Sequence, residues 1–293
     1  MSERFDKPFT QQEPIPEAGI AAALRVLGHG RLHRYNTVAG EVAEIQTVAF
    51  VRDGFADKRS SVRYGAVFAS LRTFEQVMPA TRAVAIPANT LEQLVTAVGG
   101  AMGKDKEEAL TVDAASRSLL AAARIDRTKY EGVAKAGALE VCRGLSKKVA
   151  AAGKDDWTVI EAAERASTQF QGLLGGAKGA QVDATVRKEA AGLGGDLIAW
   201  ICRQLNADVI QQAAKSDPKA RDPYGLALAA GENTVLSAVK AAGLPVPAAV
   251  LVPAFQQGTK GGDAKVVVEA GRITNEILAK APFELPATRF VLK

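Results

Sequence analysis

The residues best suited to metal chemistry in this sequence are its two histidines. His29 and His33 lie four residues apart in GHGRLHRY, which on a helix would place both on one face, as metal ligands often are. However, Gly28 and Gly30 disfavour a helix there, and no nearby Cys, Asp or Glu completes a ligand set. We therefore expect a basic exposed loop at this position rather than a metal site.

A nucleophilic active site is equally hard to assemble from these residues. The sequence has no Gly-x-Ser-x-Gly motif, and both histidines fall in one early loop, so few Ser–His or Cys–His pairs can form. Cys142 and Cys202 lack CxxC spacing and lie among apolar residues, which predicts buried thiols in a reducing compartment. Asp155 and Asp156 form a carboxylate pair, but Asp156 is explained more simply as the cap of the next helix.

Two glycine-rich segments share part of the pattern of phosphate-binding loops. LLGGAKGA at 173–180 lacks the spacing that lets backbone amides wrap a phosphate. GTKGG at 258–262 precedes a helix and would bring amides and Lys260 near an anion, but a flexible connection between helices explains it better. We therefore predict no catalytic residue, no metal and no cofactor, and we favour a protein that is not an enzyme.

Basic and aromatic residues in the first part of the chain form the candidate binding site. A curved sheet that carries arginines and aromatic rings can neutralise phosphates and stack bases, which is how many proteins hold single-stranded nucleic acid. In the alternative interpretation, the two rings belong to the core under a helix near 91–98 and the arginines form a solvated face. The candidate nucleic-acid-binding residues are Arg31, Arg34, Arg52, Lys58, Arg59, Arg63, Tyr64, Phe68 and Arg72.

The elements that would position these residues follow from the hydrophobic pattern. Residues 1–16 contain three prolines among polar residues and predict an extended arm, followed by a short helix. Val42–Arg52, Val62–Phe74 and Arg82–Ile86 are predicted strands, and Thr90 with Gln93 predicts a capping box for a helix. After Lys104 the pattern is helical, with predicted helices near 110–124, 129–152, 157–174, 181–205, 207–215, 229–242 and 263–280, then an extended apolar tail.

Composition sets the fold class. The chain has 293 residues, of which 47% are apolar and 5% aromatic, and its net charge is +5. A core made mainly of small aliphatic side chains favours closely packed helices. We therefore predict an α+β protein, predominantly α: an arm and short helix at 1–37, a small β-β-β-α region at 38–103, and a bundle-like helical body at 104–293. No window is apolar enough to span a bilayer, so we expect a cytoplasmic protein without membrane contact.

One segment resembles a known family. Residues 14–36, PIPEAGIAAALRVLGHGRLHRYN, are similar to the N-terminal arm and first helix of PLP-dependent sugar aminotransferases. In that family such a helix leads into a turn that lines the cofactor entrance. Beyond this segment the family's phosphate cup is not found, and Asp113 is the nearest match to the aspartate that would hold the pyridine nitrogen.

Three functions remain in competition. The first is a non-enzymatic protein that binds or packages nucleic acid, with single-stranded nucleic acid as the partner and homo-oligomers formed through the N- and C-terminal arms. Because it needs no active site and uses the basic loops and the arms together, we favour it. The alternatives are a coat or shell subunit without nucleic-acid contact, and a PLP-dependent aminotransferase-like protein.

Overall fold

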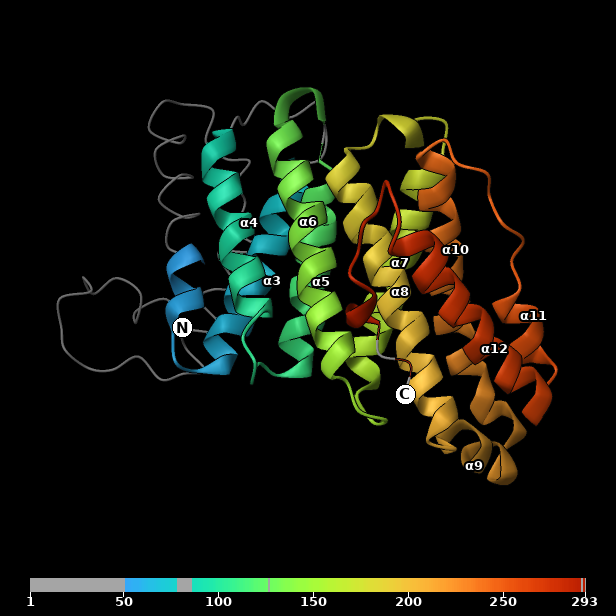
Figure 1. The fold of residues 1–293 in the computed structure, drawn as a ribbon. Coiled ribbons are helices and arrows are strands. Elements are labelled where there is room, and N and C mark those ends of the chain that lie inside the picture. The colour runs from blue at the N-terminus through green and yellow to red at the C-terminus, as the bar shows by residue number, and fades with distance from the viewer. Residues whose placement is uncertain (1–50, 78–85, 126, 291, 293) are drawn as a thin grey trace.

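The computed structural model describes residues 51–77, 86–125, 127–290 and 292, and within these ranges the chain is helical and contains no strand (Figure 1). A short 3-10 helix (Gly54–Ala56) precedes the first long helix. The α-helices are α3 (Ser60–Val77), α4 (Ala88–Met102), α5 (Ala109–Ala123), α6 (Arg127–Ala151), α7 (Trp157–Gly175), α8 (Ala184–Asn206), α9 (Val209–Ser216), α10 (Asp222–Ala241), α11 (Leu251–Gln256) and α12 (Lys260–Arg272). A π-helical turn, Ile273–Leu278, continues α12.

The long helices form two layers of stacked helical hairpins. One layer contains α3, α5, α7 and α10, and the other contains α4, α6 and α8, with α12 beside α8 (Figure 1). Neighbours within a layer run parallel: Ser70 on α3 lies 2.9 Å from Ser118 on α5 (Oγ to Oγ), and Thr234 on α10 donates to the Ser167 carbonyl on α7 at 2.9 Å. Short connections between consecutive helices make each hairpin antiparallel.

The predicted α+β class is wrong, because the second predicted strand is the interior of α3. Its buried residues Val62, Ala66 and Ala69 follow helical spacing, and Ser70 lets α5 approach closely. Tyr64 and Phe68, which the strand pattern placed on one face, are also four residues apart, so the pattern suited either structure. The other two predicted strands lie outside the described residues, apart from their last residues: Val51 and Arg52 are helical, and Ile86 is a buried, non-helical residue before α4.

The helix predicted after Pro87 is confirmed as α4, but its predicted capping box is not formed. The helix begins at Ala88 with Pro87 as N-cap and without a side-chain cap. Gln93 instead accepts a hydrogen bond from Arg52. Asp156 similarly precedes α7, but its carboxylate accepts from the Gly153 amide at 2.8 Å rather than from a helix amide.

The helices predicted after Lys104 are confirmed, with one clear error of boundary, and the short helix α11 was not predicted. α10 begins at Asp222, several residues before the predicted start near 229. Proline in the first turn of a helix lacks only an amide hydrogen that would have no partner there, so Pro223 starts this helix instead of breaking it. The predicted division into three regions is not decided by these contacts and stays a prediction.

Small residues allow the helices to pack closely. A Cβ added to Gly194 on α8 would lie 2.7 Å from the Gly231 carbonyl on α10, and one added to Gly137 on α6 would lie 2.9 Å from the Leu119 carbonyl on α5. Cys142 and Cys202 are free and buried in this core, as expected. None of the helices in the described ranges combines the length and hydropathy that crossing a membrane requires.

The C-terminal tail folds back on its own chain. Phe283, Leu285 and Phe290 are buried, and the Lys188 ammonium on α8 donates to the Glu284 carbonyl at 3.3 Å. The tail runs in front of α8 (Figure 1). It thereby adds apolar contacts to the layer that contains α6 and α8.

Candidate functional site

The candidate residues that can be placed lie on α3 and just before it; each arginine among them has a protein partner, whereas Lys58 is exposed. Arg31 and Arg34 lie outside the described residues. Arg52 donates to the Gln93 side chain at 2.6 Å, and Arg59 pairs with Asp57 at 2.8 Å. The Lys58 carbonyl accepts a hydrogen bond from Arg63.

Arg63 has a structural role. Its guanidinium forms two hydrogen bonds with Glu107, of 2.6 and 2.9 Å, and its side chain is only 10% exposed. It also donates to the carbonyls of Asp57 and Lys58. This ion pair ties the start of α3 to the start of α5, so the guanidinium is already occupied.

Tyr64, Phe68 and Arg72 do lie together on α3, one turn apart. Both rings are half-buried, and Tyr64 packs against the core. The Arg72 guanidinium lies 5.3 Å from the centre of the Phe68 ring and donates to Glu75 at 2.6 Å. One face of Phe68 is therefore already covered by a cation, and binding by this group stays a prediction.

A second set of cations gathers where α6 ends. We call Lys104, Lys147, Lys148 and Arg203 the α6 basic cluster. Lys148 donates to the Lys104 carbonyl, Lys147 to the Gly103 carbonyl at 3.3 Å, and Arg203 to the Val149 carbonyl at 3.0 Å. The last carbonyls of a helix have no partner within the helix and carry its negative dipole end, so cations are attracted to them. Helix capping alone would explain these contacts.

Lys147 and Lys148 are close enough for the charge of one to act on the other. Burial lowers the pKa of Lys148, and the neighbouring positive charge of Lys147 lowers it further. Burial also lowers the pKa of Arg203. Asp105 accepts from Lys147 at 2.6 Å, and the charges of Glu107 and Asp196 act on Lys148 and Arg203 respectively. The carbonyl partners of Lys104 and Lys148 orient these ammonium groups without neutralising them.

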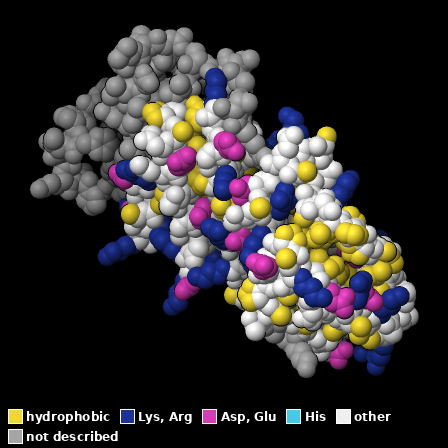
Figure 2. All heavy atoms as spheres, turned by 45° about the horizontal axis from the view of Figure 1, so that its top comes forward, with side chains coloured by type: hydrophobic (Ala, Val, Ile, Leu, Met, Phe, Trp, Pro, Cys, Tyr) yellow, Lys and Arg dark blue, Asp and Glu magenta, His cyan; other side chains and the backbone are white. Residues whose placement is uncertain are grey.

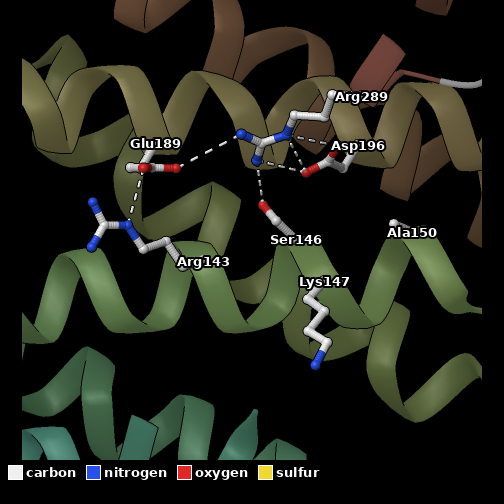
Figure 3. Close-up of a pocket in the computed structure, with 7 residues that line it drawn as sticks. All are labelled: Arg143, Ser146, Lys147, Ala150, Glu189, Asp196 and Arg289. Carbon is white, nitrogen blue, oxygen red and sulfur yellow. Dashed lines mark hydrogen bonds and ion pairs between the residues drawn. The ribbon is translucent and has the colours of Figure 1, made fainter. Parts of the chain in front are cut away.

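A hollow of about 260 Å³ lies beside this cluster (Figure 3). It is lined by α6, α8 and the tail, through Arg143, Ser146, Lys147, Ala150, Glu189, Asp196 and Arg289. In Figure 3, Arg289 points toward Asp196 and Ser146, whereas Lys147 projects away from them.

The polar contacts in the hollow are ion pairs and hydrogen bonds between its own walls. Arg289 donates from Nη2 to Asp196 at 2.9 Å and to Ser146 at 2.8 Å, and Arg143 donates to Glu189 at 3.0 Å. Burial raises the pKa of Asp196, although its ion pair with Arg289 opposes that shift. These groups connect three parts of the chain and show no geometry of nucleophile and base.

The described part of the chain also lacks a grouped set of metal-binding side chains. Asp113, the residue matched to a cofactor-binding aspartate, is held by Arg165 at 2.6 Å and Arg117 at 2.9 Å. The segment 14–36 and both histidines lie outside the described residues. Lys260 is exposed at the start of α12, where Thr259 caps the helix by accepting from the Gly262 amide at 3.1 Å.

Charge on the visible surface is mixed. Figure 2 shows Lys and Arg side chains among Asp and Glu over the middle of one face, and hydrophobic side chains at the end formed by α10, α11 and α12. Lys147 and Lys148 are adjacent in sequence, so a basic pair was visible there. Arg203 joins them only because α6 and α8 pack in parallel, which no sequence signal revealed.

The chain matches no family model, no curated protein and no solved structure.

Proposed function

We propose that this chain is a non-enzymatic protein that binds single-stranded nucleic acid and assembles with copies of itself. The observation that carries the first part is the α6 basic cluster, in which Lys104 and Lys148 bind main-chain carbonyls. A carbonyl orients a cation without cancelling its charge. The cluster therefore offers phosphates an attractive potential at a defined position.

The arrangement suits a chain of phosphates better than one isolated anion. Arg143 and Lys147 are one helical turn apart on α6 and both are exposed, with 51% and 61% of their side chains accessible. Lys104 lies beyond them at the end of α4, so the cations extend across two helices. A phosphate backbone that follows this row would meet these cations in succession, and would compete with Glu189 for Arg143 and with Asp105 for Lys147.

The experiment is a salt titration of affinity. Four phosphate contacts to a single strand predict a slope of about −2.8 in a plot of log affinity against log salt, or about a 50-fold loss of affinity between 50 and 200 mM salt. Fluorescence anisotropy of a labelled oligonucleotide measures it. A chain that leaves the oligonucleotide unbound at low salt would refute the proposal.

Variants locate the binding face. Lys147→Ala combined with Lys148→Ala removes two of the cluster's charges, and each lost phosphate contact lowers the magnitude of the salt slope by about 0.7. The matched control is Lys215→Ala with Lys219→Ala, two exposed lysines on and after α9. Arg52→Ala with Lys58→Ala tests the first predicted face in the same assay. If the control weakens binding as much as the cluster variant does, attraction is general and the cluster is not the site.

Self-assembly and the two alternatives have separate readouts. Light scattering measures the mass of the particles, and a monomer that persists at high concentration would contradict assembly. Particles that form and bind no oligonucleotide would support a coat or shell subunit. The aminotransferase-like alternative predicts an absorbance of bound PLP that borohydride abolishes.

A further inference from the structure

The C-terminal segment, residues 283–290, lies in a groove that α8 provides. We call the surface formed by Lys188, Gly192, Gly195 and Asp196 the α8 groove. These residues recur at helical spacing on one side of α8, and the opposite wall is Ser146 on α6. The segment is attached by contacts of several kinds along its length: a carbonyl contact at Glu284, an ion pair at Arg289 and a buried ring at Phe290.

The two glycines of the groove leave space for side chains of this segment. A Cβ at Gly192 would lie 2.6 Å from Nη2 of Arg289, and a Cβ at Gly195 would lie 2.5 Å from the Phe290 ring. Glycine inside a helix is unfavourable relative to alanine. Glycine at these two positions therefore lowers the stability of α8 but leaves space for the side chains of Arg289 and Phe290.

Asp196 is the ion-pair partner that the groove offers to Arg289. Only 2% of its side chain is exposed, and its carboxylate accepts from Nε and Nη2 of Arg289 at 3.2 and 2.9 Å. The groove therefore binds an arginine through this ion pair, and nothing in its geometry requires that arginine to come from the same chain.

The turn that brings the segment back is short and strained. The amides of Phe283 and Glu284 both donate to the Lys280 carbonyl, at 3.0 and 2.9 Å, and the Leu285 amide donates to Leu278 at 2.8 Å. Within this turn Glu284 has φ of 50°, a left-handed conformation that is unfavourable for a residue with a side chain. An extended connection would release that strain.

We propose that the C-terminal segment exchanges between two copies of the chain, so that Arg289 of one copy completes the Asp196 site of the other. A short strained hinge favours such an exchange, because the exchanged pair keeps the groove contacts of Arg289 and Phe290 without the turn. Return of the segment to its own groove is favoured by a local concentration in the millimolar range, so exchange increases with protein concentration. This inference rests on the self-assembly proposed above and names the segment that produces it.

The test uses two full-length variants that can be cross-linked only through an exchanged segment. Lys188→Cys and Glu284→Cys place thiols on the groove and on the segment, both at accessible positions. The two variants are mixed, unfolded and refolded together at high concentration, and treated with a short bismaleimide. Cys142 and Cys202 are buried and do not compete for the reagent.

The expected result is a cross-linked heterodimer whose yield rises with concentration. Lys240→Cys, an exposed residue at the end of α10, replaces Lys188→Cys in the control and should give no such product. A chain that carries both Lys188→Cys and Glu284→Cys reports the internal contact. Internal cross-linking in that chain, with no heterodimer in the mixture at any concentration, would overturn the inference.

A backbone variant provides the second readout. Glu284→Gly relieves the strain in the closed turn of each of the two monomers. Because exchange then releases less strain, the dimerisation constant should fall by roughly tenfold or more. Asp208→Gly is the matched control, because Asp208 also has a positive φ, of 59°, but lies at the start of α9. Equal dimerisation of the Glu284→Gly variant and the parent would count against exchange.

The outcomes separate this inference from the proposed function. Oligomers seen by light scattering without the cross-linked heterodimer would leave self-assembly standing and overturn segment exchange. If the parent chain does not bind the oligonucleotide at low salt, the nucleic-acid proposal is overturned, whereas the cross-linking result is unaffected.

Discussion

Replacement of Arg63 by alanine distinguishes a structural arginine from a nucleic-acid-binding one. Glu107, its partner, has a fully buried side chain, and the two groups form hydrogen bonds of 2.6 and 2.9 Å. Arg63→Ala leaves that carboxylate buried without a cation. It also leaves the carbonyls of Asp57 and Lys58 without the donor that they share.

The size of the effect follows from burial. Removing one member of a buried ion pair typically costs about 3–5 kcal/mol, because the remaining charge is neither solvated nor paired. An exposed pair contributes about 0–1 kcal/mol. Arg59, with 37% of its side chain exposed and paired with Asp57, is such a case. We therefore expect Arg63→Ala to lower the free energy of unfolding by about 4 kcal/mol, several times the loss for Arg59→Ala.

Urea unfolding followed by circular dichroism measures this difference. The double variant Arg63→Met with Glu107→Leu should recover much of the lost stability, because apolar side chains often replace a buried pair at little cost. Anisotropy with a labelled oligonucleotide is measured in parallel. The reasoning is refuted if Arg63→Ala unfolds at the same urea concentration as the parent while its affinity for the oligonucleotide falls.

Three further perturbations test the packing and the buried groups. Gly137→Ala places a Cβ 2.9 Å from a backbone carbonyl of α5 and should destabilise the chain by about 1–3 kcal/mol. Gly100→Ala meets open space and should stabilise the chain by about 0.5–1 kcal/mol. Thermal melts of both variants measure the difference. Glu232→Ala removes the carboxylate that accepts three backbone amides at the start of α11, so limited proteolysis should cut the segment before α11 faster, and an unchanged rate would contradict this role. Burial raises the pKa of the Cys142 thiol above its ordinary value of 9.0, and raises the pKa of the Cys202 thiol to about 12. Both thiols should therefore react with Ellman's reagent only on unfolding. Because the thiols of the unfolded chain ionise at lower pH than those of the folded chain, the free energy of unfolding should fall as pH rises above about 9.

The helices after Lys104 were predictable because their apolar residues recur at helical spacing and glycine or proline separates them. α3 was not, because its pattern fitted a strand equally well: Tyr64 and Phe68 are an even number of residues apart and also one helical turn apart. The packing of α3 on α5, seen in the contact of Ser70 with Ser118, fixes helical rather than strand spacing here. Periodicity over a short segment therefore cannot replace knowledge of the neighbouring element.

The candidate sites depended on three-dimensional contacts even more strongly. Arg63 looked like a surface cation because nothing in the sequence connects it to Glu107, which is 44 residues later. The α6 basic cluster combines residues from α6, α8 and the end of α4, and it exists only because these helices stack in parallel. An extended apolar tail was predicted, but not where Arg289 binds, since Gly192 and Asp196 reveal their role only when the tail lies on them.

The stacking of hairpins also bears on how the chain folds. Ser70 meets Ser118 on the next helix of its layer, and Ser167 on α7 meets Thr234 on α10, so the long helices pack mainly on their neighbours in the stack, whereas the C-terminal segment reaches back to α8 and α6. Local contacts of this kind give low contact order, which favours rapid folding and allows nucleation at more than one place along the array. Opening should then begin at the ends of the stack, and amide hydrogens in α5 and α6 should exchange with solvent more slowly than those in α12.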